Sequence, residues 1–447
     1  MYNIKDNVVA LATSVGPSAI NVIRCSGPDV LNIARRITNK KKPLKANFCF
    51  VSFIKNPQTK EVIDQCLVTP FIKPKSYTGQ NMVEFSMHGG NTVYQKMIKL
   101  LSDEGCRIAE KGEFTYRAFI NGKIDLIQAE SIANIVNSNS SLDVKYSLEN
   151  LGGGLSKTIE IFCQKLKNII TYMEHELDFN EEEIKHKTYK EYQAKLNQLV
   201  DDINKIINHS FVGNVKSGDV KIVICGATNA GKSSLFNYLA GYQRSIVTNI
   251  SGTTRDTVEI ILNINNINVS LVDTAGIRKT KDVVEIKGIQ RTHKTINSAD
   301  IILFVDEKNP VSAFEGFDLK VDKKKVVFVK NKIDLLKPEG PPDVFNVSCK
   351  KRIGGDKLLT HLSTLVKKHK ELFIKEHSFV ASERVIQILT LFIKKLKVSQ
   401  GLFDKDIELA IIVSSLYDCL DLFITTTSPS GKEEIINKIF KGFCVGK

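Results

Sequence analysis

One strand-to-helix connection restricts the fold of this chain more than any other feature. The apolar run 220–225 leads into Gly226-Ala227-Thr228-Asn229-Ala230-Gly231-Lys232-Ser233, and a helical pattern follows over 234–240. This is the pattern G-x-x-x-x-G-K-S in a strand–loop–helix setting. Its glycines let backbone N–H groups close around phosphate oxygens, while Lys232 adds a charge for the β and γ phosphates and Ser233 a hydroxyl for Mg²⁺. The alternation of strand, loop and helix predicts a doubly wound α/β domain over 218–371.

Three later motifs predict that the bound nucleotide is GTP. Asp273-Thr274-Ala275-Gly276 follows an expected strand, then come Asn331-Lys332-Ile333-Asp334 and Ser348-Cys349-Lys350. The Asp334 carboxylate can accept hydrogen bonds from guanine N1–H and the exocyclic amine, and Asn331 and the 348–350 loop can address the base carbonyl. A site built for those bonds leaves polar groups unpaired with adenine, so GTP is favoured over ATP.

A polar segment between these motifs is placed where a switch loop should lie. Within Gly252-Thr253-Thr254-Arg255-Asp256 we choose Thr254 for Mg²⁺ and the γ-phosphate, the alternative being a polar turn before a strand. The predicted GTP-binding residues are Asn229, Ala230, Gly231, Lys232, Ser233, Ser234, Thr248, Asn249, Ile250, Ser251, Gly252, Thr253, Thr254, Asp273, Thr274, Ala275, Gly276, Asn331, Lys332, Asp334, Ser348, Cys349 and Lys350.

The residue that positions the attacking water must come from outside the D-T-A-G motif. Ile277 follows that motif, and an alkyl group cannot orient water, so the acidic candidates are Asp282 and Glu285. Arg255 and Arg278 lie near enough in sequence to be considered as arginine fingers, although neither is identifiable as one. In the phosphate loop, the Asn229 amide oxygen is available to a monovalent cation.

Composition and charge exclude several classes of protein. Hydrophobic residues at 42% and charged residues at 25% of 447 exclude a mainly disordered, collagen-like or disulfide-scaffold chain. The 63 Lys and Arg against 49 Asp and Glu give a net charge of +14, which points to an anionic partner, although basic proteins that bind nothing are as common. Nine scattered cysteines without C-x-x-C spacing, and no apolar run of membrane-spanning length, predict a reducing, cytoplasmic protein.

The pattern outside 218–371 predicts two further domains. Residues 1–120 mix short β-like runs with two helical stretches, which indicates a compact α+β domain. These β-like runs are 19–24, 48–54, 65–71 and 82–86, and the helical stretches are 29–37 and 91–104.

Helical periodicity on both sides of the α/β domain indicates one discontinuous helical domain, formed by 121–217 and 372–447. Apolar residues recur there at three- and four-residue steps, and they are expected to form bundle core. The two stripes are Ile159, Phe162, Leu166, Ile169, Met173 and Leu177, then Tyr189, Tyr192, Leu196, Leu199, Ile203 and Ile206.

Several motifs together resemble one known family. N-A-G-K-S-S-L, G-T-T-R-D and D-T-A-G-I-R resemble the potassium-activated GTPases. The rest of the chain narrows the resemblance to the MnmE (TrmE) family of tRNA uridine-modification GTPases, over essentially all 447 residues. The segments that carry it are S-Y-T-G at 76–79, V-E-F and H-G-G within 83–90, G-E-F-T-Y-R-A-F at 112–119, N-G-K-I-D-L-I-Q-A-E at 121–130 and F-C-V-G-K at 443–447.

This resemblance implies a particular biochemistry. It implies a homodimer whose 1–120 domain binds tetrahydrofolate and dimerises, with an inserted Ras-like G domain. The partner would be the FAD-dependent MnmG (GidA) protein, in a heterotetramer that acts on tRNA and not at a membrane. Together they would add an aminomethyl or carboxymethylaminomethyl group to C5 of the wobble uridine. The implied cofactors are GTP, Mg²⁺, K⁺ and a 5,10-methylene or 5-formyl tetrahydrofolate.

The resemblance also assigns residues to roles. Mg²⁺ would be bound by Ser233 and Thr254, as the motifs already suggest, and Glu285 would orient the catalytic water. The K⁺ ligands would be Asn229, Thr248, Ile250 and Thr253, and the folate-binding residues Arg24, Glu84, Lys123 and Lys447. Without the resemblance, Glu84 and Lys123 would be interpreted as ordinary surface charges.

Two residues next to these motifs invite a catalytic interpretation that the chemistry does not favour. Free cysteine is most often a small buried hydrophobe, so we expect this of Cys444 in preference to a nucleophile. His88, beside two glycines, is expected to be a turn or core histidine. Gln80-Asn81 stands where the family frequently has Glu-Asp, which weakens the folate assignment relative to that of GTP.

Two other classes of GTPase are compatible with parts of this sequence. A GTP-operated ribosome-assembly factor without modification chemistry could carry the same nucleotide motifs. Such a factor should have a second G domain or an RNA-binding module with a G-x-x-G clamp, whereas 371–447 has the pattern of amphipathic helices. A membrane-associated GTPase is supported only by the general basicity of the chain.

Overall fold

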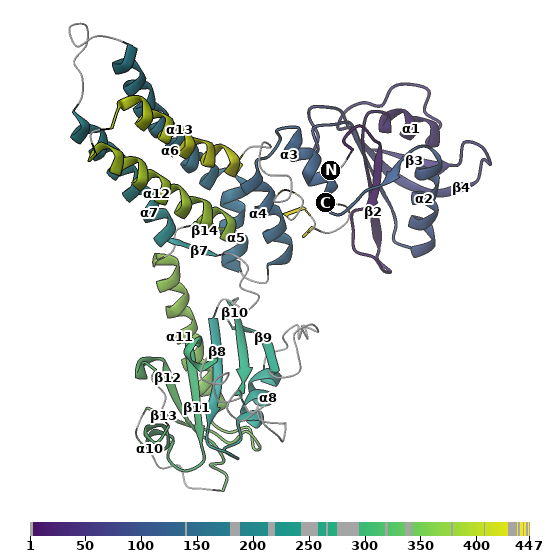
Figure 1. Cartoon of the computed structure of the whole chain (residues 1–447). Coiled ribbons are helices and arrows are strands. Elements are labelled where there is room, and N and C mark those ends of the chain that lie inside the picture. Colours follow the sequence, from purple (N-terminus) through teal and green to yellow (C-terminus); the bar gives the residue numbers. More distant parts are fainter. Residues whose placement is uncertain are drawn as a thin grey trace, which may run out of the picture. The chain divides into compact units, whose positions relative to one another are not determined.

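The computed structural model describes most of the chain, in two compact units (Figure 1). The first unit comprises 1–136, 147–207 and 381–447, and the second comprises 137–146 and 208–380. The described residues are 3–138, 141–178, 188–212, 220–242, 258–264, 267–274, 295–317, 321–335, 341, 343–376, 379–405, 407–427, 436, 439–440, 442–443 and 446.

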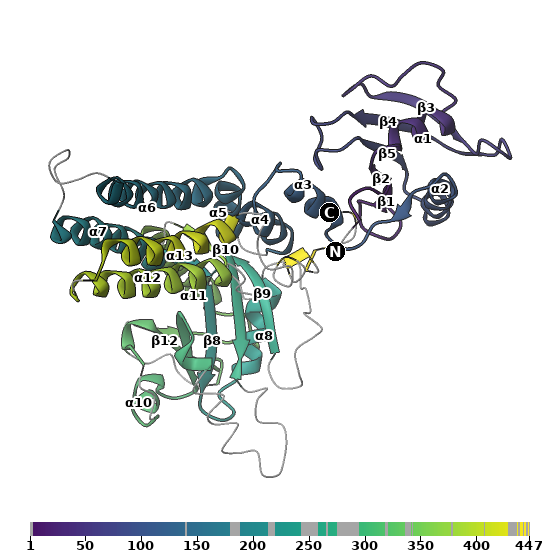
Figure 2. The ribbon, with the colours of Figure 1, turned by 45° about the horizontal axis from the view of Figure 1, so that its top comes forward.

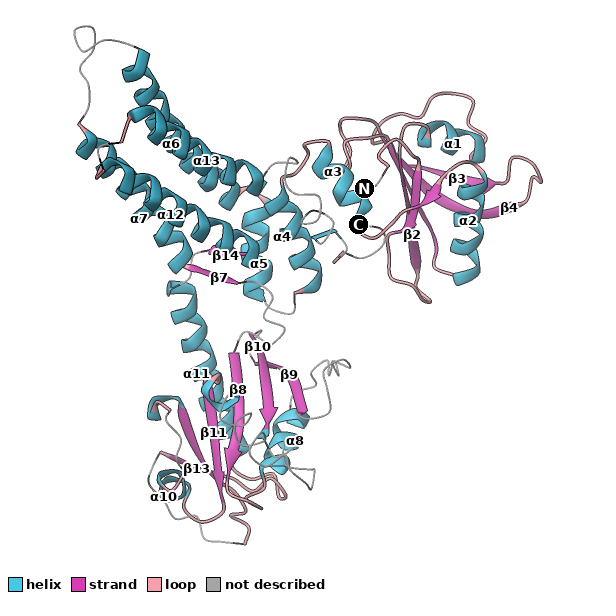
Figure 3. Cartoon of the chain, viewed as in Figure 1, coloured by secondary structure: helices cyan, strands magenta, loops and turns pink. Residues whose placement is uncertain are grey.

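The amino-terminal part of the first unit is a six-stranded sheet in the order β3-β4-β5-β2-β1-β6, with two helices on one face (Figure 3). Side chains alternate between the faces of a strand, so Ile23 and Phe85 pack against the helices while Arg24 and Glu84 point to the other face. The elements are β1 (Val8–Leu11), β2 (Ile20–Ser26), α1 (Val30–Ile37), β3 (Phe50–Lys55), β4 (Val62–Phe71), β5 (Met82–His88), α2 (Asn91–Asp103) and β6 (Arg107–Ile108). The short strands β1 and β6 were not predicted from the sequence.

The carboxyl end of the described chain packs against the helix that follows this sheet. Helix α3 (Glu113–Ile120) contributes Tyr116 and Phe119, which contact the fully buried ring of Phe440 at centroid distances of 5.4 Å and 6.0 Å. Phe443 lies 5.5 Å from the Phe440 ring. These aromatic contacts hold the last described residues beside the amino-terminal domain.

Four long helices from two distant parts of the chain pack side by side (Figure 2). They are α6 (Gly154–Asp178), α7 (Tyr189–Asn208), α12 (Glu383–Phe403) and α13 (Leu409–Thr427). The shorter helices α4 (Leu126–Asn137) and α5 (Ser141–Leu151) precede all four in the chain. Hydrogen bonds between exposed side chains join these helices, for example from Gln400 Nε2 on α12 to Asn197 Oδ1 on α7 at 2.9 Å. Helix α12 is also joined to α4, because Arg384 Nε donates to Glu130 Oε1 at 2.6 Å.

The second unit contains the predicted doubly wound sheet, in the order β13-β12-β11-β8-β10-β9. Its strands are β8 (Val220–Gly226), β9 (Val258–Ile264), β10 (Ile267–Asp273), β11 (Ile301–Asp306), β12 (Val326–Lys330) and β13 (Val344–Asn346), with only β9 antiparallel to its neighbour among them. Helices α8 (Lys232–Tyr242) and α11 (Gly355–Glu376) cover one face. Helix α10 (Pro310–Glu315) packs on the other, and a 3₁₀ turn occupies Lys323–Lys325.

The segments that lead into and out of this sheet pair with each other. β7 (Ser210–Val212) and β14 (Phe379–Ala381) form a two-stranded sheet. The chain segment before the α/β sheet and the segment after it therefore lie side by side. That arrangement is what insertion of one domain into another requires.

The predicted fold class is confirmed, with an α+β amino-terminal domain, a helical domain and an α/β domain. The predicted stripes are buried except at two positions. Leu177 is 47% exposed because it lies in the last turn of α6, and Tyr189, the first residue of α7, is half-buried. Among the described residues, no helix is both long and apolar enough to cross a membrane. The domain boundaries drawn from the sequence stay predictions.

We predict that the helical bundle depends on the buried seam of α12. Leu396→Ala should lower the free energy of unfolding by about 2–5 kcal/mol, because Leu396 is fully buried and truncation leaves a cavity. Leu391→Ala, on the same helix but 45% exposed, is the matched control and should change it by less than about 1 kcal/mol. Urea unfolding followed by circular dichroism at helical wavelengths measures both. Equal effects would contradict the packing described for α12.

Candidate functional site

The phosphate loop leaves the sheet where a ligand crevice is expected. β8 lies between β10 and β11 and is parallel to both, so its carboxyl end opens at the position where α/β sheets bind ligands. Gly231 has φ +87°, and a Cβ there would collide with the side-chain amide of Asn331, so only glycine fits. Asn229 has φ +62°, a conformation that asparagine tolerates better than most residues.

Two side chains of this loop carry the groups expected for phosphate and Mg²⁺. Lys232 Nζ donates to the carbonyl oxygens of Ala227 at 2.6 Å and Gly226 at 3.3 Å, which holds the ammonium over the loop. Ser233 Oγ donates to Asp273 Oδ2 at 2.8 Å, and Asp273 is almost fully buried. A hydroxyl beside a carboxylate fits Mg²⁺, which prefers oxygen ligands and takes few from the protein when phosphates supply others.

Asn331 links the phosphate loop to the 348–350 loop. Its buried side chain donates from Nδ2 to the Ala230 carbonyl at 3.1 Å, and its Oδ1 accepts from the Cys349 N–H at 3.3 Å. The sequence predicted contact with the base for Asn331, and the structure adds this bridging role, which sequence reasoning missed. Three motifs that are far apart in the chain are therefore held in one arrangement.

The carboxylate that the sequence predicts to bind the base, Asp334, is oriented by a neighbouring hydroxyl. Ser348 Oγ donates to Asp334 Oδ1 at 2.6 Å and itself accepts from the Lys351 N–H at 3.1 Å. That hydrogen bond lowers the pKa of Asp334, so the group is an ionised acceptor, as guanine N1–H and N2–H require. Burial raises the pKa of the Cys349 thiol to about 11, which makes it a packing residue. Lys332 Nζ pairs with Glu307 Oε2 at 2.8 Å.

The structure brings together part of the predicted nucleotide site. Asn229 to Ser234, Asp273, Thr274, Asn331, Lys332, Asp334 and the 348–350 loop all lie at one end of the sheet. Thr274 Oγ1 donates to the Ile224 carbonyl at 2.8 Å, which ties it to the central strand. The predicted residues 248–254, Ala275, Gly276 and Glu285 lie outside the described residues.

The first unit holds a second candidate site, built on the face of its sheet opposite to α1 and α2. Arg24 on β2 and Glu84 on β5 are directly opposite in register, and Arg24 Nε and Nη2 both lie 2.8 Å from Glu84 Oε1. The guanidinium is 5.6 Å from the Tyr77 ring and 5.7 Å from the Phe114 ring. Both aromatic residues lie in segments that carry the family resemblance, but the sequence alone predicts no role for them. Burial raises the pKa of Tyr77.

The end of the chain contributes a backbone group to this site. Arg24 Nη1 donates to the Gly446 carbonyl at 3.2 Å. Gly446 has φ +93°, and a Cβ there would collide with the Leu11 backbone, so the close approach depends on glycine. Lys123 lies with its side chain against Gly79, and no described hydrogen bond joins it to Arg24 or Glu84. Lys447 lies outside the described residues.

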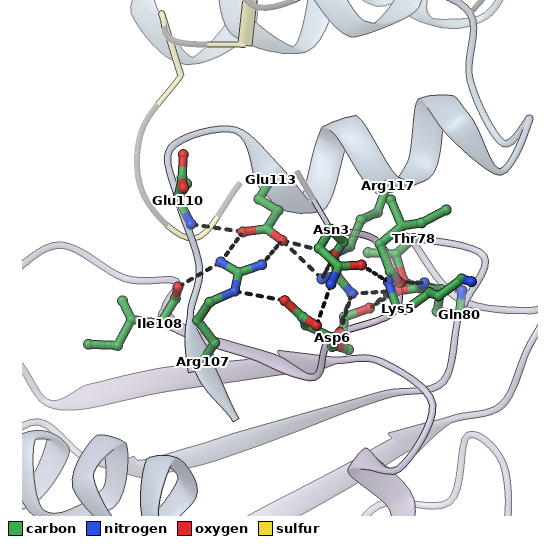
Figure 4. A network of polar contacts seen from close by, with 12 residues as sticks. Asn3, Lys5, Asp6, Thr78, Gln80, Arg107, Ile108, Glu110, Glu113 and Arg117 are labelled. Atoms are coloured by element: carbon green, nitrogen blue, oxygen red, sulfur yellow. Dashed lines mark hydrogen bonds and ion pairs between the residues drawn. The ribbon is translucent and has the colours of Figure 1, made fainter. Parts of the chain in front are cut away.

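Beneath this site, one buried guanidinium connects several segments (Figure 4). Arg117 is fully buried, and its Nη1 donates to the Asp6 carbonyl and Gln80 Oε1, both at 2.8 Å. Its Nη2 donates to Glu113 Oε1 at 2.9 Å and to the Asn3 carbonyl at 3.1 Å. The position that departs from the family pattern, Gln80, is thus an acceptor for Arg117.

Glu113 is the charge partner at the centre of this network. Its side chain is fully buried and also takes a bidentate contact from Arg107, with Nη2 at 2.8 Å from Oε1 and Nη1 at 3.1 Å from Oε2. Burial raises the pKa of Glu113. Hydrogen bonds from Arg107, the Glu110 N–H and Arg117 outweigh burial, so the pKa is lowered overall.

The expectation that His88 could be a core histidine is wrong. Its side chain is 76% exposed at the end of β5, and its Nδ1 lies 2.7 Å from Asp64 Oδ1. The Asp64 carboxylate also accepts from the His88 N–H at 2.9 Å, so the carboxylate fixes the strand end. The alternative expectation, a histidine at a turn, agrees with its place before Gly89. Cys444 lies outside the described residues.

The α/β domain, with its phosphate loop, buried N-K-x-D asparagine and oriented aspartate, is that of a P-loop guanine-nucleotide-binding protein. Comparison with known proteins defines the family. Residues 7–123 match the family model described as GTP-binding protein TrmE N-terminus, and residues 126–444 match the MnmE helical domain.

Named relatives resemble this chain along its whole length. The tRNA modification GTPase MnmE of Desulforamulus reducens is 34% identical over 461 residues, with 99% of each chain covered. That of Francisella tularensis subsp. holarctica is 35% identical over 466 residues with both chains fully covered. That of Aquifex aeolicus is 33% identical over 450 residues, covering 99% of this chain and 100% of the other. The chain therefore belongs to the MnmE family of tRNA modification GTPases.

We predict that Glu113 stabilises the amino-terminal domain above acidic pH. The pKa of Glu113 is lower in the folded state than the ordinary glutamate pKa, near 4.5. The stabilisation is therefore complete above pH 4.5, and it is lost as the pH falls through the pKa of the folded state. Glu113→Gln should cost about 3 kcal/mol at pH 7, because Arg117 is left as a buried, uncompensated charge.

Thermal unfolding of wild type and Glu113→Gln between pH 3 and pH 7 tests this, and their difference should shrink below about pH 4.5. Glu110→Gln is the matched control, because the Glu110 side chain is exposed and only its backbone N–H contacts Glu113. A difference that is constant across this pH range would contradict the assigned role.

Proposed function

We propose that this protein hydrolyses GTP and acts in the modification of wobble uridine in tRNA. The observation that carries the proposal is the phosphate loop joined through Asn331 to an oriented Asp334, in a chain that matches MnmE proteins from end to end. The names of those relatives describe tRNA modification GTPases. We further propose that the protein is cytoplasmic.

In the proposed hydrolysis, water attacks the γ-phosphate in line. Lys232 and the backbone N–H groups of the loop bind the phosphate oxygens and stabilise the charge that develops on them. Ser233 and Thr254 would bind Mg²⁺, which supplies charge neutralisation between the phosphates. Glu285 is proposed to position the water, because Ile277 cannot do so.

We predict that K⁺ stimulates GTP hydrolysis more than Na⁺ does. Asn229 carries an amide oxygen in the phosphate loop, with Thr248, Ile250 and Thr253 as the other proposed ligands, and a cation there would take the place of an arginine finger. The measurement is the initial rate in each salt at fixed ionic strength. Asn229→Ala should lose the difference, whereas Glu285→Ala should hydrolyse GTP far more slowly in both salts with near-normal GTP affinity. Equal rates of the wild type in K⁺ and Na⁺ would remove the cation from the mechanism.

The proposed partners follow from the same family membership. We propose a homodimer that works with an FAD-dependent MnmG-type protein and uses a tetrahydrofolate as the one-carbon donor. The contacts that support a folate site are those around Arg24, whose guanidinium lies near two aromatic rings and pairs with the Glu84 carboxylate. Pterin N–H groups suit Glu84, and a glutamate tail suits Arg24, Lys123 or Lys447.

We predict that removal of Lys447 weakens folate binding without changing GTP affinity. One charge-assisted contact should be lost, worth about 1.5–3 kcal/mol, or roughly 10- to 150-fold in affinity. Calorimetry with 5-formyl-tetrahydrofolate measures this, and Lys447→Arg is the charge-preserving control. Unchanged affinity in the truncated chain would show that Lys447 is a bystander. Absence of binding by the intact protein would overturn the folate assignment.

The whole proposal is tested in cells that lack the protein. Their tRNA should lose the C5 modification of wobble uridine, as measured by mass spectrometry of nucleosides. Expression of the wild type should restore it, and Lys232→Ala should not, because the phosphate contact is lost. Lys324→Ala, an exposed residue away from the nucleotide end of the sheet, is the control that should restore it. Normal modification together with a defect in ribosomal subunits would instead support the assembly-factor alternative.

A further inference from the structure

The loop that follows α1 is the most basic described part of the amino-terminal domain. Lys40, Lys41, Lys42 and Lys45 are all exposed, and Arg35 lies in the last turn of the helix. None of these five side chains forms an ion pair with any residue that the structure describes. They therefore form a concentrated positive charge without neutralising partners. Together with Phe48, we call them the α1 basic surface.

Local backbone geometry holds this loop against the helix. Asn39 adopts a left-handed conformation with φ +52°, and the Lys40 N–H then donates back to the Arg35 carbonyl at 3.0 Å. Arg35 Nη2 donates to the Lys41 carbonyl at 2.9 Å. The lysine run is thus fixed beside Arg35. A favourable interaction with the helix dipole explains arginines in the last turn but not the four lysines beyond it.

A hollow of about 270 Å³ opens at this end of the helix, lined by Asn32, Arg35, Arg36, Asn39 and Lys40. Every one of these side chains can donate hydrogen bonds, and none is acidic. The Nε atom of Arg35 is enclosed and has no hydrogen-bond partner within the described structure. Because this Nε atom is shielded from solvent, an anion in the hollow would be bound through the terminal N–H groups of the Arg35 guanidinium and through Lys40.

The charges of the two arginines are not equivalent. Arg36 Nε lies 2.8 Å from Glu104 Oε2 and its Nη1 lies 3.7 Å from Asp29 Oδ2, so carboxylates already neutralise it. Arg35 and Lys40 keep their charge for a ligand. Asn32 Nδ2 donates to Asp29 Oδ1 at 2.7 Å, so the hollow suits an anion bound by Arg35 and Lys40 and oriented by the Asn39 amide.

An exposed aromatic ring accompanies the cations. Phe48 is 56% exposed, and Lys45 Nζ lies 5.8 Å from its ring centroid. Lys40 Nζ lies 5.0 Å from the ring of Phe50, which is half-buried at the start of β3. Lysines beside an exposed aromatic ring are the combination that binds a phosphate backbone while stacking an unpaired base.

We propose that the α1 basic surface binds the phosphate backbone of tRNA at a segment with an unpaired base. Arg35 and Lys40 hold one phosphate in the hollow, Lys41, Lys42 and Lys45 neutralise its neighbours, and Phe48 stacks on the base. This inference rests on the proposed function, which supplies tRNA as the substrate. A lipid headgroup is disfavoured because no apolar side chain lines the hollow, and a lone flat ring matches a base better than an acyl chain.

The test compares tRNA binding by full-length variants, measured by filter binding across a range of KCl concentrations. The triple variant Lys40→Gln, Lys41→Gln, Lys42→Gln should bind tRNA about tenfold more weakly at 100 mM salt. Its slope of log affinity against log salt should be smaller in magnitude by about 2, since three phosphate contacts no longer release counterions. GTP hydrolysis without tRNA should be unchanged.

The matched control is the triple variant Lys323→Gln, Lys324→Gln, Lys325→Gln. It removes the same charge from three consecutive exposed lysines that precede β12, at the edge of the sheet opposite the nucleotide-binding loops. It should keep the wild-type affinity and salt slope. Equal losses in the two triple variants would show that only net charge matters and would overturn the proposal.

Phe48 distinguishes a base from a bare phosphate. Phe48→Leu should weaken binding to an unpaired oligonucleotide at least about fivefold while leaving a fully paired duplex unaffected, and Phe48→Trp should restore it. If the lysine variant instead loses binding only to vesicles of anionic lipid, the surface contacts a membrane and the tRNA assignment fails. Wild-type affinity of the lysine variant for tRNA would refute the role of this surface. If cells that lack the protein still lose the tRNA modification, the proposed function would nevertheless stand.

Discussion

A buried ion pair, Arg117 with Glu113, organises the amino-terminal domain. The Arg117 guanidinium takes the carbonyls of Asn3 and Asp6 and the side chain of Gln80 as acceptors, so the first residues and the 78–80 loop converge on α3. A charge in that position is tolerable only when its hydrogen bonds are satisfied, which demands that all these segments be correctly placed. The pair thus stabilises the domain only when these segments are in one particular arrangement.

The nucleotide domain follows the same principle with a neutral group. Asn331 is buried and can satisfy both ends of its amide only if the phosphate loop and the 348–350 loop lie on either side of it. One side chain therefore sets the distance between the phosphate loop and the 348–350 loop. Gly231 completes this arrangement, since any side chain there would displace the amide.

The sequence predicted local features well and distant contacts poorly. The phosphate loop, the D-T-A-G and N-K-x-D motifs and the helical stripes are written in short segments whose geometry depends on nearby residues. The pairing of Arg24 with Glu84 depends on strand register across the sheet, and only the family resemblance suggested that the two act together. The roles of Tyr77 and Phe114 beside Arg24 depend on tertiary packing, which no short segment of sequence encodes. His88 was misjudged in part because its burial depends on where the sheet ends.

The hydrogen bond from Arg24 to the Gly446 carbonyl joins residues separated by 422 positions. A ribosome makes Arg24 early, and the sheet around it has a core of its own that can fold while the rest of the chain is still being made. The surroundings of Arg24 nevertheless stay incomplete until translation has passed Gly446 and the aromatic residues Phe440 and Phe443 have docked on α3. A chain terminated before Phe440 would carry a folded first domain in which Arg24 lacks this acceptor. The contact thereby makes synthesis of residues 440–446 a condition for completion of the surroundings of Arg24.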